Sequence, residues 1–222
     1  MTDFDPAWMQ SVESLRRATT RNVLSPKLVA LIRVLLDISV THLNRTGARR
    51  HMREALAAGA TRAEIAAVIK LASVIGIHAY AAAAPEVRAA MEATGRGMEA
   101  IPAAATPATD VMRAAGALNA SWRDIERWDP EWLECFVRMG SAVWTDGVLD
   151  AGVIELLCVA GDASVTHLWS PGVRRHAEAA LRHGVTPEEL LEALRIVAEQ
   201  GLESVDFALP ILESVAAGRA LA

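Results

Sequence analysis

The chain has 222 residues, of which 52% are apolar, 5% are aromatic and 22% are charged, and its formal net charge is −5. This apolar fraction with so small a net charge excludes a disordered chain, and the acidic balance offers no basic surface for nucleic acid. Ala, Leu and Val supply most of the apolar content, which favours packed helices over the β-branched and aromatic composition of a β-sandwich.

The first segment in chain order, residues 1–10, is acidic and contains no apolar core of a signal peptide. The two most apolar stretches follow at 28–43 and 66–85, and they contain Arg33 and Lys70 respectively. Because charges are costly inside a bilayer, we interpret both stretches as buried helices of a soluble bundle and expect no membrane partner.

Helix-start patterns occur next in the first half. Ser25 precedes Pro26, which is the order expected of an N-cap followed by the first helical residue. Thr61 and Glu64 have the spacing of a capping box. Gly59, just before this box, suits the left-handed residue that ends the preceding helix.

The same patterns return in the second half. Asp150 is placed to cap a helix, Thr186 and Glu189 repeat the capping box, and Gly184 precedes that box. Apolar residues also follow the 3.6-residue period of a helix. We therefore expect four or five helices in each half.

Only two cysteines occur, Cys135 and Cys158, and they do not form a CxxC motif. So sparse a pair in a chain of this length indicates a reducing compartment without a disulfide framework. The sequence therefore predicts a cytoplasmic protein.

An internal repeat relates the two halves. Residues 39–51 read SVTHLNRTGARRH, and residues 164–176 read SVTHLWSPGVRRH. This shift of 125 continues without a gap to Pro85 and Pro210, and a DPxW motif near the start of each half recurs with a shift of 124. The same unit therefore occurs twice in the chain.

We predict a first repeat over 1–98, a connector over 99–128 and a second repeat over 129–222. The expected fold is an all-α duplicated helical bundle with pseudo-twofold symmetry.

Each half carries the pattern His-x3-Ala-Leu-x2-Gly-x-Thr-x2-Glu, at 51–64 and again at 176–189. This pattern resembles the core signature of the carboxymuconolactone decarboxylase and alkylhydroperoxidase-D superfamily. With the DPxW segments, the resemblance covers nearly the whole chain except 99–128. It implies functional positions for His51 and His176.

One branch of this superfamily, the peroxidases, carries Cys-x2-Cys-x3-His. Here the cysteine positions hold Asn44 and Gly47 in the first half and Trp169 and Gly172 in the second. A thiol–disulfide cycle needs an attacking thiolate and a nearby resolving thiol, so peroxidase activity is disfavoured.

The decarboxylase branch also lacks these cysteines, and its members are lyases that need no cofactor. They decarboxylate a γ-lactone that carries a carboxylate, in the breakdown of aromatic acids. The resemblance therefore implies a cofactor-free lyase or isomerase that uses histidine acid–base catalysis on a small carboxylated, lactone-type metabolite.

The candidate acid–base residues are histidines of the repeat. His42 and His51 correspond to His167 and His176, and each pair could converge across a turn marked by Thr-Gly or Pro-Gly. A helical hairpin there would bring His176 alongside Asp162, and a carboxylate fixes the tautomer of an imidazole and raises its basicity. The structural alternative is that these histidines bond the backbone at a tight turn and that the aspartate pairs helices.

Glu155 lies 21 residues before His176. The resemblance implies a proton-transfer glutamate 19 residues before this histidine, so the match requires a two-residue insertion around the turn. Because the first half has Ala30 at the corresponding place, we expect the second half to keep a site that the first half has lost. The alternative is an ordinary surface glutamate.

An anionic substrate favours an arginine beside the proton-transfer group. Arg174 and Arg175 directly precede His176, although both could form surface salt bridges instead. Trp169, beside His167, could form the wall of an apolar pocket or cover a subunit contact, and we prefer the pocket.

Three other functions stay open: a redox protein of the peroxidase branch, a divalent-metal-dependent enzyme and a non-catalytic helical scaffold. Imidazole and carboxylate groups suit zinc or another divalent ion, but no closely spaced ligand motif occurs. The donor sets are His42, His51 and His78 in the first half, and His167 and His176 with Glu155 or Glu203 in the second.

The expected partner is a small-molecule substrate. Single units of the superfamily assemble into rings, which implies a closed homo-oligomer of the duplicated chain, with a trimer favoured and a dimer as the alternative.

Overall fold

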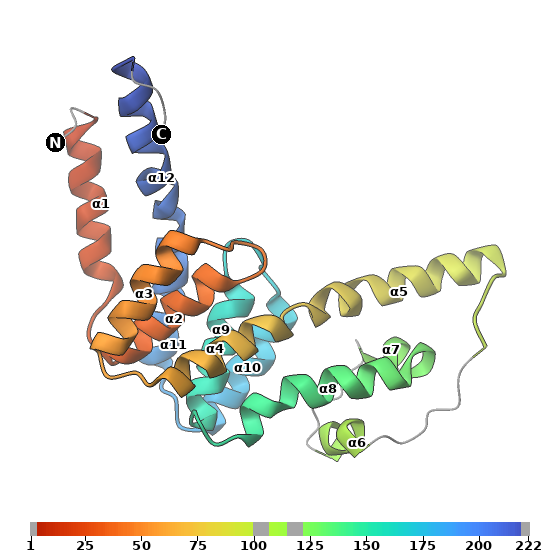
Figure 1. Ribbon diagram of the computed structural model, residues 1–222. Helices are drawn as coiled ribbons and strands as arrows, with labels where there is room; N and C mark the ends of the chain where they lie inside the picture. The colour runs from red at the N-terminus through yellow and green to blue at the C-terminus, as the bar shows by residue number, and fades with distance from the viewer. Residues whose placement is uncertain (1–3, 100–106, 115–121, 219–222) are drawn as a thin grey trace.

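The computed structural model describes residues 4–99, 107–114 and 122–218, and the regular structure in these ranges is helical (Figure 1). The first half contains α1 (Pro6–Thr19), α2 (Pro26–Ile38), α3 (Arg45–Ala57), α4 (Arg62–Val74) and α5 (Ile77–Thr94). The second half contains α8 (Pro130–Thr145), α9 (Ala151–Ala163), α10 (Ser170–Arg182), α11 (Pro187–Glu199), the 3-10 turn η2 (Gln200–Leu202) and α12 (Glu203–Ala216). Between the halves lie α6 (Pro107–Ala114) and α7 (Arg123–Trp128). The all-α prediction is confirmed, with five α-helices per half among the described residues.

Most of the predicted helix starts are found in the structure. The side chains of Ser25, Thr61 and Thr186 each accept a hydrogen bond from the backbone N–H three residues later, and both capping boxes are complete. Gly59 and Gly184 have φ values of +89° and +87°, which glycine adopts without steric cost. Local sequence chemistry therefore sets these helix boundaries.

Two local predictions are wrong. Asp150 stands at the N-cap of α9, but its side chain makes no capping hydrogen bond. The Thr46–Gly47 and Pro171–Gly172 pairs do not form the turns, because α3 begins at Arg45 and α10 begins at Ser170. The first turn of a helix tolerates proline, because backbone N–H groups at these positions have no acceptor within the helix and proline, which lacks an N–H, loses no bond there.

Four helices, two from each half, build the central core. α2 contacts α4, α9 and α11, and α9 also contacts α4 and α11. Leu31, Ile32, Val68, Leu157 and Ile196 are almost completely buried there, and each such side chain contributes about 1.5–3 kcal/mol. The two repeats therefore share one core, which accounts for the high apolar fraction.

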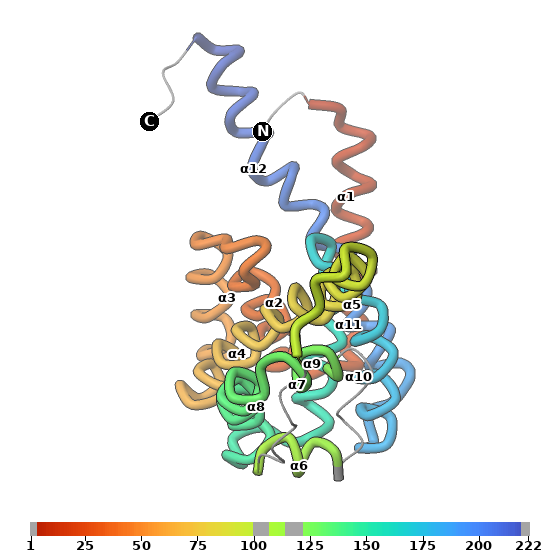
Figure 2. Tube along the Cα trace, turned by 90° about the vertical axis from the view of Figure 1, so that its right-hand side faces the viewer, coloured from red at the N-terminus to blue at the C-terminus, as the bar shows by residue number. Residues whose placement is uncertain are grey.

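The first helix of each half packs on the other half: α1 contacts α11, and α8 contacts α4. Figures 1 and 2 show α1 and α12 rising together from the bundle, whereas α5 and α8 extend from it in another direction. Thr41 and Thr166, which the shift of 125 relates, lie 2.7 Å apart at their Oγ1 atoms. The two SVTHL turns therefore touch each other.

The described part of the connector covers the arm formed by α5 and α8. α6 contacts α8, and α7 contacts both helices of the arm. Trp122 and Ile125 join Ile77, Leu133 and Val137 in a second buried cluster. By contrast α12, the counterpart of α5, has no buried residue among those described.

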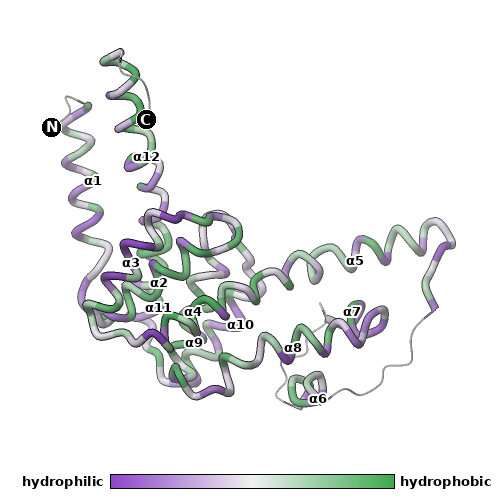
Figure 3. Tube along the Cα trace, viewed as in Figure 1, coloured by the Kyte–Doolittle hydropathy of each residue, from purple (hydrophilic) through white to green (hydrophobic). Residues whose placement is uncertain are grey.

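One stretch among the described residues, Arg62–Thr94, is long and apolar enough to cross a membrane, because it contains an 18-residue window with a mean hydropathy of 1.7. It consists of α4 and α5, which are separate helices with a break at residues 75–76. Apolar residues follow both helices (Figure 3), and Val68 and Leu71 of α4 belong to the core. Such a stretch is weak evidence for a membrane, because core helices have the same composition.

Candidate active site

The SVTHL turn has the same backbone geometry in both halves. Leu43 and Leu168 adopt left-handed φ values of 50° and 52°. The residue after each leucine donates its backbone N–H to the carbonyl of Asp37 or Asp162, at 2.8 and 2.7 Å respectively. These bonds join α2 to α3 and α9 to α10, so the aspartate at the end of each first helix lies beside the start of the next.

Gly47 and Gly172 leave the room that these aspartates need. A Cβ atom at either glycine would overlap the carboxylate of Asp37 or Asp162. Both carboxylates are buried, and one oxygen of each makes no hydrogen bond. The glycines are therefore required for packing within the helix rather than for a turn.

In the second half, His176 is the centre of a hydrogen-bonded chain. Its Nδ1 lies 2.6 Å from Oε2 of Glu155, and its Nε2 lies 2.8 Å from Nη2 of Arg175. The indole N–H of Trp144 donates to Oε1 of Glu155 at 2.8 Å. Because a carboxylate only accepts and a guanidinium only donates, Nδ1 carries the proton and Nε2 presents its lone pair.

Burial sets the charge state of this pair. It lowers the pKa of His176 below its ordinary value, and the hydrogen bond to Glu155 opposes this only in part. Burial alone would raise the pKa of Glu155. The hydrogen bonds from His176 and Trp144 and the charge of Arg175 outweigh burial, so the net effect is a pKa below the ordinary value. At neutral pH the pair is therefore a carboxylate and a neutral imidazole, which is the form that accepts a proton at Nε2.

Asp162 and His78 extend the cluster toward the first half. Oδ2 of Asp162 lies 3.9 Å from Nε2 of His176, and its Oδ1 lies 3.6 Å from Nδ1 of His78. Burial raises the pKa of Asp162 to about 7. Burial, with the nearby charges of His167, Arg175 and His176, lowers the pKa of His78 to about 3. Near neutral pH, Asp162 therefore exists in both protonated and ionised forms.

This cluster borders a cavity of about 500 Å³. Its polar lining includes His78, Glu155, Asp162, Arg175 and His176. Its apolar lining includes Leu71, Ile75, Met112, Trp122, Phe136 and Leu157. An apolar pocket of this size with a few polar groups at one cluster is typical of a small-molecule site.

In the first half, the equivalent histidine has a different partner. Nδ1 of His51 lies 2.5 Å from Oδ2 of Asp37, and Nε of Arg50 lies 3.3 Å from Nε2 of His51. Ala30 occupies the position of Glu155, so the imidazole bonds the aspartate instead. The predicted asymmetry between the halves is therefore present in the geometry.

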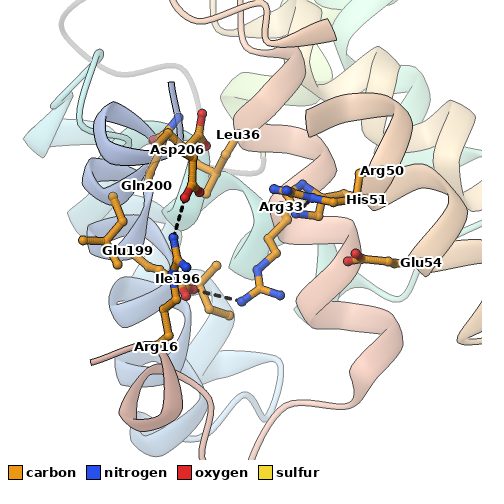
Figure 4. Close-up of a pocket in the computed structure, with 12 residues that line it drawn as sticks. Arg16, Arg33, Leu36, Arg50, His51, Glu54, Ile196, Glu199, Gln200 and Asp206 are labelled. Carbon is orange, nitrogen blue, oxygen red and sulfur yellow. Dashed lines mark hydrogen bonds and ion pairs between the residues drawn. The ribbon is translucent and has the colours of Figure 1, made fainter. Parts of the chain in front are cut away.

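His51 borders a cavity of its own, with a volume of about 410 Å³. Figure 4 shows arginines from opposite walls of this cavity, each in an ion pair. Arg33 lies 2.9 Å from Glu199, and Arg16 lies 2.7 Å from Asp206. The interior of this cavity therefore carries charges that already neutralise each other.

The histidines of the two turns bond residues from the opposite half. Nε2 of His42 lies 2.7 Å from Oε2 of Glu203, and Nε2 of His167 lies 2.8 Å from Nδ1 of His78. The shift of 125 relates Glu203 to His78. His42 and His51 therefore have separate partners, as do His167 and His176.

This exchange rearranges the expected metal-ligand sets. The prediction that His42, His51 and His78 converge is wrong because His78 contacts His167, and Glu203 lies against His42 rather than in the second half's set. Three donor atoms lie within 4.8 Å of one another in two groups among the described residues: His78, Asp162 and His167, and Asp37, His42 and Glu203. In both groups two donors already hydrogen-bond each other, so an ion would have to break that bond to enter.

The two predicted arginines differ in position. Arg174 is exposed, whereas Arg175 is partly buried, lines the cavity and contacts His176. Trp169 lies against His78, with ring centroids 4.9 Å apart and an interplanar angle of 17°, outside the residues that line the cavity.

The sequence interpretation placed Trp169 at the pocket and missed the aromatic residues that line the cavity. Trp144 bonds Glu155, and Trp122 and Phe136 line the cavity with ring centroids 6.4 Å apart. A pattern for them exists in the sequence: four of the six tryptophans lie within 122–144. Trp122 and Trp128 lie in the connector and Trp144 has Thr20 at the corresponding place of the first half, so three of these four tryptophans have no counterpart there.

The fold and this geometry define a helical repeat protein with a histidine-centred acid–base cluster at a small-molecule cavity. The model of the carboxymuconolactone decarboxylase family matches residues 130–214, which include Glu155 and His176. A crystal structure from Burkholderia xenovorans, of a protein provisionally described as a gamma-carboxymuconolactone decarboxylase subunit, is 33% identical. The match covers 95% of this chain and 86% of that one, with a TM-score of 0.84. Among curated proteins, none matches the chain significantly.

The chain therefore belongs to the carboxymuconolactone decarboxylase and alkylhydroperoxidase-D-like superfamily. This confirms the resemblance drawn from the two His-x3-Ala-Leu-x2-Gly patterns.

Proposed function

We propose that the protein is a carboxymuconolactone decarboxylase-like lyase or isomerase that transfers a proton at a carbon atom of a small carboxylated, lactone-type metabolite. The observation that supports this most strongly is the chain from Trp144 through Glu155 and His176 to Arg175. It fixes the proton of a buried imidazole on Nδ1, so that Nε2 carries the lone pair, which Arg175 contacts.

Arg175 has two roles in this proposal. In the free protein its guanidinium donates to Nε2 of His176 and occupies the lone pair. A substrate carboxylate is the stronger acceptor and forms a charge-assisted hydrogen bond with the guanidinium. Binding of the carboxylate therefore draws Arg175 away and frees Nε2 for proton transfer.

His176 then acts as base and as acid in turn. Nε2 takes a proton from the carbon next to the lactone carbonyl, and the electron pair of that C–H bond passes into the conjugated carbonyl. In an isomerase, the imidazolium returns the proton to another carbon of the conjugated system. In a lyase no C–H bond is broken first: the C–C bond to the carboxylate breaks, carbon dioxide leaves, and the electron pair of that bond passes into the conjugated carbonyl. Nε2 then delivers a proton, taken up from water, to the carbon next to that carbonyl.

Glu155 is a positioning residue here. Its carboxylate fixes the proton on Nδ1 and stabilises the imidazolium that forms during the reaction. Asp162, 3.9 Å from Nε2, provides a second proton-holding group next to the reacting nitrogen.

The cysteines support this proposal over the redox alternative. Cys135 is exposed, and Cys158 is buried with its pKa raised well above the ordinary value by burial and by the carboxylates of Glu155 and Asp162. A thiol in that environment is a poor nucleophile. We therefore propose that neither thiol takes part in the reaction.

The proposed setting is a cytoplasmic homo-oligomer, a trimer in preference to a dimer, that works in the breakdown of aromatic compounds without a cofactor. The family and the neighbour's description as a subunit support this setting. Elemental analysis of the purified protein tests the cofactor-free part, because a stoichiometric divalent metal would favour the metal-dependent alternative.

Deuterium exchange tests the proposed chemistry and does not require that the natural substrate be identified first. Carboxylated lactones, both monocarboxylates and the dicarboxylate γ-carboxymuconolactone, are incubated with the protein in D₂O, and NMR follows deuterium at the carbon next to the carbonyl and the release of carbon dioxide. We expect His176→Gln to reduce the faster of these rates about 100-fold or more. An unchanged rate in a folded variant excludes His176 as the acid–base group.

A further inference from the structure

We infer that the His176 cavity selects a carboxylic acid with one carboxylate and an apolar, ring-sized body, rather than a substrate with two carboxylates. This inference rests on the proposed function, because it names the substrate class of the same site. It follows from how the two cavities of one chain differ at positions related by the repeat.

The linings of the two cavities correspond closely. Under the shift of 125, Arg50 and His51 of the first cavity map to Arg175 and His176 of the second, and both pairs line their cavities. Ile196 of the first cavity likewise maps to Leu71 of the second. The two cavities are therefore versions of one site.

At four corresponding places the first cavity carries a charge and the second does not. Charged lining residues of the first cavity are replaced in the second by small or apolar ones. These replacements are Arg33 by Cys158, Glu199 by Val74, Glu54 by Ala179 and, with the shift of 124, Arg16 by Gly140. The repeat architecture accepts charges at these positions, so their loss from the His176 cavity reflects the ligand rather than the fold.

The second cavity adds aromatic and apolar walls instead. Trp122 and Met112 come from the segment that separates the repeats, and Phe136 comes from α8. Trp122 is buried and packs toward Phe136. Apolar groups of a ligand gain about 25 cal/mol for each Å² that these walls remove from water. The volume of about 500 Å³ holds on the order of fifteen non-hydrogen atoms.

The polar groups of the cavity accept one carboxylate and oppose a second. Arg175 is the cation in contact with His176, whereas Glu155 and Asp162 stand within 4 Å of the same imidazole. Arg182 also lines the cavity but is exposed, so solvent weakens its attraction. A second carboxylate would lie either against these acidic groups or against the apolar wall, and both places penalise a charge.

Calorimetric binding of cinnamate and of muconate to the full chain tests this inference. Cinnamate carries one carboxylate and a ring, whereas muconate carries two carboxylates. We expect cinnamate to bind at least 10-fold more tightly than muconate and than its neutral analogue, cinnamyl alcohol. If cinnamate does not bind, or if muconate binds as tightly, the inference is wrong.

Two pairs of variants assign the binding to this cavity. Phe136→Ala should weaken cinnamate binding about 10-fold, and Met139→Ala, an exposed residue on the same helix, should leave it unchanged. Ala179→Glu, which restores the charge of the first cavity, should abolish binding while Ala179→Gln reduces it only slightly. Equal affinities within either pair would contradict the inference.

The same titration separates this inference from the proposed function. His176→Gln should still bind cinnamate within about threefold of the unchanged protein, although it loses proton exchange. If cinnamate binds tightly but proton exchange survives in His176→Gln, the inference about the cavity's selectivity stands and the proposed role of His176 is wrong.

Discussion

The two halves of this chain show how one helical unit gives the same histidine different partners and different cavities in its two copies. Both halves place a histidine at the same point of the same hairpin, beside a buried aspartate and a close-packed glycine. In the second half Glu155 bonds Nδ1 of His176, Arg175 contacts Nε2, and Oδ2 of Asp162 is left without a hydrogen bond. In the first half the aspartate itself takes Nδ1 of His51, and ion pairs cross the cavity.

One substitution in the repeat, glutamate for alanine at position 155, therefore changes the role of the aspartate as well as that of the histidine. Because Glu155 bonds Nδ1 of His176, Asp162 does not bond that nitrogen and lies beside Nε2 instead. Both halves share the backbone of this hairpin, so the different partners of the two histidines follow from their side-chain surroundings.

The largest effect in this comparison, after loss of His176 itself, is expected for Glu155→Gln. The variant removes the charge that orients His176 and stabilises its protonated form, so turnover in the exchange assay should fall about 10- to 100-fold. Glu155 raises the pKa of His176, and its loss should therefore move the acid limb of the pH–rate profile to lower pH. An acid limb that stays in place would show that Glu155 has no influence on the reacting histidine.

Arg175→Gln should mainly raise KM. It removes a charged hydrogen-bond donor, which corresponds to about 10-fold or more in affinity. Arg174→Gln is the matched control, because Arg174 is exposed and adjacent, and its KM should stay within twofold. Equal effects of the two variants would indicate a general attraction of anions rather than a contact in the site.

Asp162→Asn should change the pH dependence of stability. The pKa of Asp162 is raised to about 7 by burial, so the folded state prefers the protonated acid, and the wild-type chain loses stability as pH rises from about 4 to about 7. The variant lacks this loss. Its free energy of unfolding relative to wild type should therefore increase by on the order of a few kcal/mol across this range.

Denaturant unfolding of both proteins at pH 4.5 and pH 8 measures this difference. Asp37→Asn is a useful comparison, because Asp37 accepts a hydrogen bond from His51 and the variant loses a charge-assisted bond worth about 1.5–3 kcal/mol. A stability difference for Asp162→Asn that does not vary with pH would contradict the assigned state of Asp162.

The smallest effect is expected for the cysteines. Cys135→Ser combined with Cys158→Ala should leave the exchange rate within about threefold, because proton transfer requires no thiol. If the double variant folds but loses its activity, the redox alternative would be favoured.

The sequence was sufficient for the fold class, the helix starts and the superfamily, because the repeat, the capping boxes and the left-handed glycines are local patterns. It also singled out Glu155, because the family resemblance implies a glutamate near this position, and the repeat showed that the first half has Ala30 there. It did not reveal that His78 and Glu203 cross to the turn of the opposite half, because that contact depends on how the halves pack. The aromatic wall was missed for the same reason: Trp122 and Phe136 meet only through the tertiary fold.

The central claim is that one half of the chain is reactive and the other is not. The most direct test compares His176→Gln with His51→Gln in the deuterium-exchange assay on the same carboxylated lactone, with both variants checked for folding. We expect His176→Gln to lose about 100-fold or more and His51→Gln to retain at least half of the rate. Equal losses in the two variants, or a larger loss for His51→Gln, would contradict the assignment of the site to the second half.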